Sequence, residues 1–438
     1  MHTFVFFGAS GDLFAKKIVP ALSRLFVEGM LPKDTRVIGV SRKPWTDEEF
    51  RDRVVGGTSH IPRESISFVT GDVNDVELPA LLAKALRDSE PIFYLALTPT
   101  LYDAGIQTIH ATLSLLGRGS SFGRVLIEKP FGRNTEEAAL LNARIDETLG
   151  EERVLRIDHY IQKESVQNIL AYRFSNELLS TVWNGRSTSN VKVFILENTL
   201  ITGRGEFYDA TGALDDVVQN HALELLAATL MDNPKEFSAE KTRQARTAVF
   251  SKLRLTSQGN IRAQYEGYRD IPGVRRDSET ETYVKLNLSF DHPEWQGVPI
   301  IIEAGKGLPL HRGGVQIGLK QSGARICFDE ECSHEDTFEF LLAPEERTNL
   351  HVWGKKPGVL SALTRHSLTF SFAESFKDVY TDRAYDRVLF DAYRNDSSRF
   401  VSREEIMAAW AFTDEARKVL VNEPLRFYKP GSLPDVLS

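Results

Sequence analysis

The sequence is poor in cysteine, with only Cys327 and Cys332 among 438 residues. Disulfides therefore cannot organise the fold, as they do in small secreted domains. Long apolar runs are also missing, because no segment approaches the ~20 apolar residues of a membrane-spanning helix. The first apolar run, Thr3 to Phe7, has no basic leader and is too short for a secretion signal. We therefore expect a cytoplasmic protein with no membrane partner.

Positive charge is in deficit. The chain has 53 Lys+Arg against 61 Asp+Glu, a formal net charge of −8 and a pI of about 5.8. This balance gives no general reason to bind nucleic acid, so any site for an anionic ligand must be local. The 42% hydrophobic content is ample for a buried core. At roughly 150 residues per domain, the length predicts about two or three domains.

The first 150 residues alternate short apolar runs with longer amphipathic stretches, which is the pattern of a doubly wound parallel sheet buried on both faces. Such a Rossmann-like domain is a candidate for nucleotide binding. The predicted strands are Thr3 to Phe7, Arg36 to Val40, Ser65 to Val69, Pro91 to Leu97 and Arg124 to Ile127. The predicted helices are Leu13 to Glu28, Thr46 to Val55, Leu78 to Arg87, Thr100 to Leu116 and Thr135 to Leu149.

After about Asn190 the strands no longer alternate with helices, which favours a large, mainly antiparallel sheet with helices, an α+β domain. The fold class is therefore α/β followed by α+β. We expect a dinucleotide-binding domain over residues 1–155 and a substrate-binding and oligomerisation domain over 156–438. The clearest strands are Val191 to Leu196, Thr282 to Leu288, Thr337 to Leu342, Leu350 to Trp353 and Ser367 to Phe372, with helices at Leu214 to Leu230 and Arg403 to Leu420.

A glycine-containing turn follows the first predicted strand and leads directly into a helix. Its residues Gly8, Ser10, Gly11, Asp12 and Leu13 are expected to bind a dinucleotide. In such a turn the backbone N–H groups and the helix N-terminus meet a pyrophosphate, and glycine permits its close approach. The spacing alone also fits a plain strand-to-helix turn, since Phe14 stands where a third small residue is usual. The preceding strand favours the phosphate loop.

The second predicted strand is followed by Ser41, Arg42 and Lys43. An NAD site usually carries a carboxylate here for the ribose 2′-hydroxyl, whereas an arginine accommodates a 2′-phosphate. We therefore predict NADP as the cofactor, with Arg42 against its 2′-phosphate, and NAD as the less favoured alternative. The other reading is that both cations are solvated surface charges.

Three further segments are too rich in polar groups for ordinary loops. They are Glu128 to Gly132, Arg156 to Glu164, and Gly212 to His221, whose helical period places Val217, Val218 and His221 on nearby turns. The glycine turn Gly8 to Leu13, the first two of these segments, and Gln219 to His221 of the third resemble the motifs of the glucose-6-phosphate dehydrogenase family, in the same order and at similar separations. The likeness continues through Phe93 to Leu97, Gly203 to Gly205, Gly305-Lys306, Lys355 to Gly358 and Ala384 to Arg387, and so spans nearly the whole chain.

This resemblance implies an enzyme that transfers hydride from C1 of glucose 6-phosphate to NADP, giving 6-phosphogluconolactone without a metal. His221 would be the general base and Asp158 the carboxylate that holds its imidazole, a pairing that raises imidazole basicity. His159, Tyr160 and Lys163 would bind the phosphate. Lys129, before a proline bond expected to be cis, would touch both substrate and cofactor, and Lys17 would be a further active-site lysine.

By the same resemblance Glu197, Asp216 and Lys306 would contact the sugar hydroxyls. Two positions depart from the family. His311 stands where a second cation is usual, and Gln162 replaces a usual glycine, which adds bulk beside the phosphate site. These departures motivate one alternative, the same chemistry on another hexose with an anionic 6-substituent. A second alternative is a catalytically silent NADP sensor.

Each assigned residue also has a structural interpretation. His221 on an otherwise apolar helix could be a core histidine, and Lys129 and Lys306 could be solvated charges. Cys327, Cys332 and His334 could bind zinc, although an acidic loop between two strands is the better account of that segment. The resemblance further implies a homodimer or homotetramer built through the large sheet.

Overall fold

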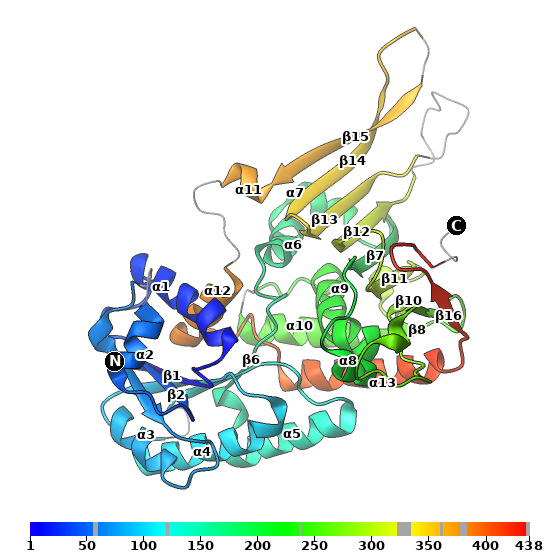
Figure 1. Cartoon of the computed structure of the whole chain (residues 1–438). Coiled ribbons are helices and arrows are strands. Elements are labelled where there is room, and N and C mark those ends of the chain that lie inside the picture. The colour runs from blue at the N-terminus through cyan, green and yellow to red at the C-terminus, as the bar shows by residue number, and fades with distance from the viewer. Residues whose placement is uncertain are drawn as a thin grey trace. The chain divides into compact units, whose positions relative to one another are not determined.

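A computed structural model describes residues 1–55, 60–119, 122–236, 238–321, 334–359, 362–376 and 383–434 (Figure 1). Cys327 and Cys332 lie outside these residues. The chain divides into two compact units. The first comprises Met1–Gln162, Phe237–Arg243 and Arg383–Met407, and the second comprises Lys163–Glu236, Gln244–Asp382 and Ala408–Ser438. The predicted domain boundary between residues 155 and 156 stays a prediction.

The first unit contains a six-stranded sheet in the order β3-β2-β1-β4-β5-β6, and every neighbouring pair is parallel. This is the strand order of a Rossmann fold, as predicted. The strands are β1 (His2–Phe7), β2 (Arg36–Ser41), β3 (Ile66–Thr70), β4 (Glu90–Leu95), β5 (Arg124–Ile127) and β6 (Val154–Arg156). The helices are α1 (Val19–Val27), α2 (Asp47–Val55), α3 (Leu78–Leu86), α4 (Tyr102–Leu116), α5 (Thr135–Thr148) and α12 (Ala384–Arg394).

The strands of this sheet are apolar along their length because helices cover them. Figure 1 shows α3, α4 and α5 side by side, and α12 next to α1. Helix α12 comes from far along the chain, yet Val388 and Leu389 belong to the same buried cluster as Phe4, Phe6 and Leu22. A two-bond ion pair between Arg24 and Asp386 joins α1 to α12, at 2.7 and 2.5 Å. The first unit is therefore closed by a late segment of the sequence.

The second unit contains a ten-stranded sheet in the order β15-β14-β13-β12-β7-β11-β10-β9-β16, with β8 paired to β10. Most neighbours are antiparallel, as predicted, while β7 with β11 and β9 with β16 are parallel. Its strands are β7 (Thr188–Leu196), β8 (Leu253–Leu255), β9 (Ile261–Tyr265), β10 (Tyr283–Phe290), β11 (Ile300–Gly305), β12 (Arg312–Leu319), β13 (Thr337–Ala343), β14 (Arg347–Lys355), β15 (Leu363–Ser371) and β16 (Leu425–Tyr428). Its helices are α6 (Glu164–Ser175), α7 (Glu177–Val182), α8 (Gly205–Ala213), α9 (Leu223–Leu230) and α11 (Phe372–Ser375). Two further helices, α10 (Ala239–Lys252) and α13 (Arg403–Leu420), begin among residues of the first unit and end among residues of the second.

Two predicted helices contain π-helical turns. The first helix begins with a π-helix at Phe14–Ile18, and a second π-helix, Leu214–Ala222, lies between α8 and α9. Such wider turns are rare and occur often at functional sites. Lys17 lies in the first of them, and Asp216 and His221 lie in the second.

Candidate active site

The turn after β1 requires glycine at its first position. Gly8 has a φ of +76°, and an added Cβ would stand 2.3 Å from the carbonyl oxygen of Ala96, so only glycine fits there. The N–H groups of Gly8 and Ala9 donate to the Val40 carbonyl at 2.9 and 3.2 Å. Ser10 and Gly11 remain exposed at the start of the first helix. The predicted loop residues are thus presented together, at the carboxyl end of β1.

Arg42 follows β2 and projects into solvent, with its side chain 80% exposed. Its Nε lies 3.7 Å from a carboxylate oxygen of Asp72. Hydrogen bonds from the backbone and side chain of Asn74 lower the pKa of Asp72, so this carboxylate is ionised at neutral pH. The predicted 2′-phosphate residue is therefore accessible and has an acidic neighbour that the sequence did not indicate.

Glu128, Lys129 and Asp158 gather in the first unit. The Lys129 ammonium lies 3.6 Å from a carboxylate oxygen of Asp158, and Asp158 is only 2% exposed. The backbone N–H of Tyr160 donates to the other oxygen of Asp158 at 2.7 Å. The Lys129–Pro130 bond is cis, which confirms that prediction.

Glu128 is partly buried and is held by aromatic residues. The Tyr94 hydroxyl donates to its carboxylate at 2.5 Å, and the Tyr102 hydroxyl donates to its backbone carbonyl at 2.7 Å. Burial raises the pKa of Glu128, against the opposing effect of the Tyr94 hydrogen bond. The pKa of Tyr94 is also raised, chiefly by burial and then by the charge of Glu128. A carboxyl group with a raised pKa thus directly precedes Lys129 in the chain.

The predicted phosphate-binding residues fall on a connection between elements. The rings of His159 and Tyr160 are 6.3 Å apart, and His159 also stacks on Tyr385 at 6.5 Å. Lys163 is the residue that precedes the first turn of α6. Gln162, expected to add bulk here, is fully buried and donates to the Arg399 carbonyl at 2.8 Å. Its bulk is accommodated inside the first unit.

The π-helix Leu214–Ala222 carries His221 on a partly exposed face, while Val217 and Val218 are buried. The Asn220 side chain accepts from the His221 backbone N–H at 2.6 Å and donates to the carbonyls of Asp215 and Asp216. Gly212 begins this arrangement with a φ of +63°, and an added Cβ would stand 2.4 Å from a Glu281 oxygen. The turn is therefore fixed at both ends by local hydrogen bonds and close packing.

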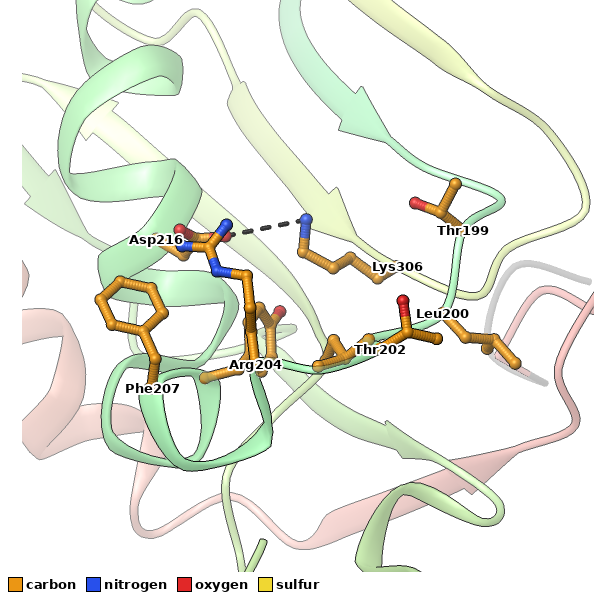
Figure 2. Close-up of a pocket in the computed structure, with 9 residues that line it drawn as sticks. Thr199, Leu200, Thr202, Arg204, Phe207, Asp216 and Lys306 are labelled. Carbon is orange, nitrogen blue, oxygen red and sulfur yellow. Dashed lines mark ion pairs between the residues drawn. The ribbon is translucent and has the colours of Figure 1, made fainter. Parts of the chain in front are cut away.

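The three predicted sugar-contacting residues meet in the second unit. The Lys306 ammonium, directly after β11, lies 2.9 and 3.0 Å from the two oxygens of Glu197 and 3.7 Å from Asp216. Lys306 and Asp216 line a pocket of ≈ 280 Å³ (Figure 2). Its other lining residues are Thr199, Leu200, Ile201, Thr202, Arg204, Phe207 and Tyr208. His311, one of the two positions that depart from the family pattern, is exposed and directly precedes β12.

Comparisons with known proteins agree with these features. Residues 5–168 match the family model "Glucose-6-phosphate dehydrogenase, NAD binding domain", and residues 170–435 match "Glucose-6-phosphate dehydrogenase, C-terminal domain". The chain belongs to the glucose-6-phosphate dehydrogenase family. A relative from Arabidopsis thaliana, glucose-6-phosphate 1-dehydrogenase 5, cytoplasmic, is 33% identical over 97% of this chain and 87% of its own. One from Borreliella burgdorferi, glucose-6-phosphate 1-dehydrogenase, is 32% identical over 94% and 90%.

Solved structures of the glucose-6-phosphate dehydrogenase family are similar over nearly the whole chain. One, of the enzyme in complex with its substrate glucose-6-phosphate, has a TM-score of 0.89 and 28% identity over 100% of this chain and 96% of its own. Another, from Mycobacterium avium, has a TM-score of 0.84 and 31% identity, and covers 99% and 94%. These matches confirm the predicted family and fold class. They also confirm the predicted use of NADP and the predicted oxidoreductase activity, that of a glucose-6-phosphate 1-dehydrogenase. The roles of individual residues stay predictions.

The structure of this family member also reveals residues that the sequence did not single out. Tyr94 and Tyr385 lie in two segments of the family resemblance, which implies no role for either. The Tyr94 hydroxyl donates to Glu128, and the Tyr385 ring stacks on His159. Arg204 and Phe207 line the pocket beside Lys306. The motif around Gly203 to Gly205 was the available signal for Arg204. None of the helices in the described ranges combines the length and apolar character needed to cross a membrane.

Proposed function

We propose that the chain oxidises glucose 6-phosphate at C1 with His221 as the general base. His221 takes the proton from the C1 hydroxyl, and bound NADP would supply the acceptor for the hydride that leaves C1. The supporting observation is that one π-helix bears both His221 and Asp216, and that Asp216 lines a pocket with Lys306. A base and sugar-contacting groups on one rigid element can orient the hexose for proton removal.

The other proposed roles belong to residues of the Arg156 to Glu164 segment and to three charged residues elsewhere in the chain. Asp158 stabilises the protonated imidazole of His221, a role suited to a carboxylate that is almost fully buried. His159, Tyr160 and Lys163 supply donors and charge to the 6-phosphate. Lys129 contacts substrate and cofactor, and Lys17 contributes a further cation. Glu197 joins Asp216 and Lys306 in binding the sugar hydroxyls.

The first unit fits NADP. Its strand order is that of dinucleotide-binding folds, and Gly8 provides the turn that brings backbone N–H groups and the helix start toward a pyrophosphate. We propose that Gly8, Ser10, Gly11, Asp12 and Leu13 hold the pyrophosphate. Arg42 then binds the 2′-phosphate and gives NADP its advantage over NAD.

The test is NADPH formation, followed by absorbance, with glucose 6-phosphate, unphosphorylated glucose and galactose 6-phosphate. We expect wild type to turn over glucose 6-phosphate best and His221→Asn to lose at least about 100-fold in kcat, the usual contribution of a general base. His60→Asn, at an exposed histidine of the first unit that has no proposed role, is the matched control. Faster turnover of another sugar phosphate would reassign the substrate, and no turnover of any would reject the activity. Full activity in His221→Asn would reject only the base.

We also propose that the protein is a cytoplasmic homodimer or homotetramer, with residues 1–155 binding NADP and 156–438 binding the sugar and joining the subunits. β15 lies at one edge of the large sheet, and its Leu368 is 61% exposed. Exposed edge strands readily pair or pack with another chain. The cytoplasmic proposal rests on the name of the Arabidopsis relative. Light scattering after size exclusion measures the assembly, and a monomeric mass would contradict it.

A further inference from the structure

Arg204 stands at the pocket that Lys306 and Asp216 line, and it has no role in the mechanism above. The centre of its guanidinium lies 4.8 Å from the centroid of the Phe207 ring, so the ring fixes its position by a cation–π contact. Within the residues that the structure describes, no carboxylate forms an ion pair with Arg204. Figure 2 shows Arg204, Asp216 and Lys306 directed toward the same space. The guanidinium donors are therefore available to a ligand.

The charges around this pocket balance. Lys306 is shared between the carboxylates of Glu197 and Asp216, which leaves that cluster with one excess negative charge. Arg204 supplies the compensating positive charge. A phosphate dianion gains little from such a neutral group of charges, whereas an uncharged molecule with several hydroxyls finds both donors and acceptors.

The shape and lining of the pocket also favour an uncharged polyol. Its volume of ≈ 280 Å³ is close to the lower end of the range for small-molecule sites, about 300–1,000 Å³. Thr199 and Thr202 add hydroxyl groups to the lining, and the half-exposed Phe207 ring adds an apolar surface. A ring with hydroxyl groups on its edge and C–H groups on its faces matches such a mixed lining.

We propose that Arg204 is a specificity-determining residue of this sugar site, and that it donates to hydroxyl groups of the hexose ring. The proposal rests on the proposed function and deepens it. The planar fork of an arginine can donate two parallel hydrogen bonds to neighbouring oxygens, and Phe207 keeps that fork oriented. A site that hydrogen-bonds a hydroxyl discriminates strongly against a substrate that lacks it, because its polar groups are left unpaired.

The experiment compares wild type with Arg204→Gln and Phe207→Leu on glucose 6-phosphate and on its 2-deoxy, 3-deoxy and 4-deoxy analogues. Inhibition by inorganic phosphate is measured alongside, as a probe of phosphate binding alone. The matched control is Arg394→Gln, because Arg394 is likewise an exposed arginine 5.7 Å from a phenylalanine ring, that of Phe390, and does not line the pocket. Wild-type turnover of glucose 6-phosphate must be established first, and its absence would overturn the proposed function rather than this inference.

We expect Arg204→Gln to lower kcat/KM for glucose 6-phosphate by roughly 10- to 100-fold, as the loss of charged hydrogen bonds predicts. Phosphate inhibition should stay at the wild-type level. For at least one deoxy analogue, the variant and wild type should differ much less, since the hydroxyl that Arg204 contacts is already missing. Phe207→Leu should give a smaller loss in the same direction. The inference is overturned by wild-type kinetics in Arg204→Gln, by equal losses with every analogue, or by weakened phosphate inhibition.

Discussion

Arg42 is the residue on which cofactor preference is expected to depend, and its surroundings set the size of the effect. Its nearest acidic neighbour is Asp72, at 3.7 Å from Nε. Two unit charges at this separation in water interact by about 1 kcal/mol, and exposed pairs usually contribute less. A phosphate monoester carries about 1.5–2 negative charges and three acceptor oxygens. The 2′-phosphate can therefore displace Asp72 as the partner of Arg42.

Two substitutions at this position should have opposite effects. Arg42→Ala should raise the KM for NADP by about 10- to 100-fold, which corresponds to the ~1.5–3 kcal/mol of hydrogen bonds to a charged group. The KM for NAD, which has no 2′-phosphate, should change less than about twofold. Asp72→Asn should lower the KM for NADP by about two- to fivefold, because it removes a competing and repelling carboxylate.

The assay is the initial rate of reduced cofactor formation, with NADP or NAD varied at saturating glucose 6-phosphate. Arg144→Ala removes an exposed arginine from α5 of the same unit and is the control for a general change in charge. A measurement at two salt concentrations adds a check, since screening should weaken the Arg42 effect. Equal changes in the KM of both cofactors for Arg42→Ala, or a higher KM for NADP in Asp72→Asn, would refute the reasoning.

Three further predictions concern buried and charged groups. Burial raises the pKa of Glu128 above its ordinary 4.5, so above pH 4.5 the folded protein holds a proton that the unfolded chain releases. The free energy of unfolding of wild type should therefore fall as the pH rises above 4.5. Measured by urea unfolding from pH 5 to 8, this free energy should fall less steeply in Glu128→Gln than in wild type. Matching slopes would contradict this. The Tyr208 hydroxyl is buried without a hydrogen-bond partner among the described residues, so Tyr208→Phe should leave the free energy of unfolding unchanged or raise it by up to about 1 kcal/mol. Tyr94→Phe removes a donor to Glu128 and should lower the free energy of unfolding by about 1–3 kcal/mol. Similar losses of stability in both variants would contradict this prediction. Lys306→Met leaves Glu197 and Asp216 without the cation between them, and it should raise the KM for glucose 6-phosphate at least about tenfold. Lys320→Met, which removes an exposed ammonium that donates to the Gly185 carbonyl, should leave that KM unchanged. An unchanged KM in Lys306→Met would remove Lys306 from the sugar site.

The sequence predicted the first sheet well because its strands are buried on both faces. Such strands are continuous apolar runs, and five of the six were found within two residues of their ends. β6 was missed because it has only three residues, Val154–Arg156. β12 was missed because its sequence contains Gly313, Gly314 and Gly318, which are unfavourable in strands. An added Cβ at Gly314 would stand 2.2 Å from the Phe340 carbonyl, so the close approach of β13 explains one of these glycines.

The candidate site was predictable where several polar residues share one motif, and not where a single residue acts alone. Asp216 and His221 fell in one segment, and Glu197 and Lys306 followed from the family resemblance. Arg204 was not assigned, because a lone arginine in a loop cannot be distinguished from a solvated charge until its neighbours are known. The π-helical turns escaped prediction for a different reason: their hydrogen-bond register leaves no clear trace in the spacing of apolar residues.

The packing of α12 on α1 has a consequence for how the protein is made. A ribosome releases the six strands of the first sheet long before it releases Asp386, Val388 and Leu389, which complete the buried cluster of that unit. The emerging N-terminal segment therefore keeps apolar surface exposed until nearly 400 residues have been synthesised, a state that favours aggregation and engages chaperones. For the same reason a fragment that ends at Gln162 would lack Asp386, which forms two hydrogen bonds with Arg24. The dinucleotide-binding unit is contiguous in space, but it can be produced only by translating almost the whole chain.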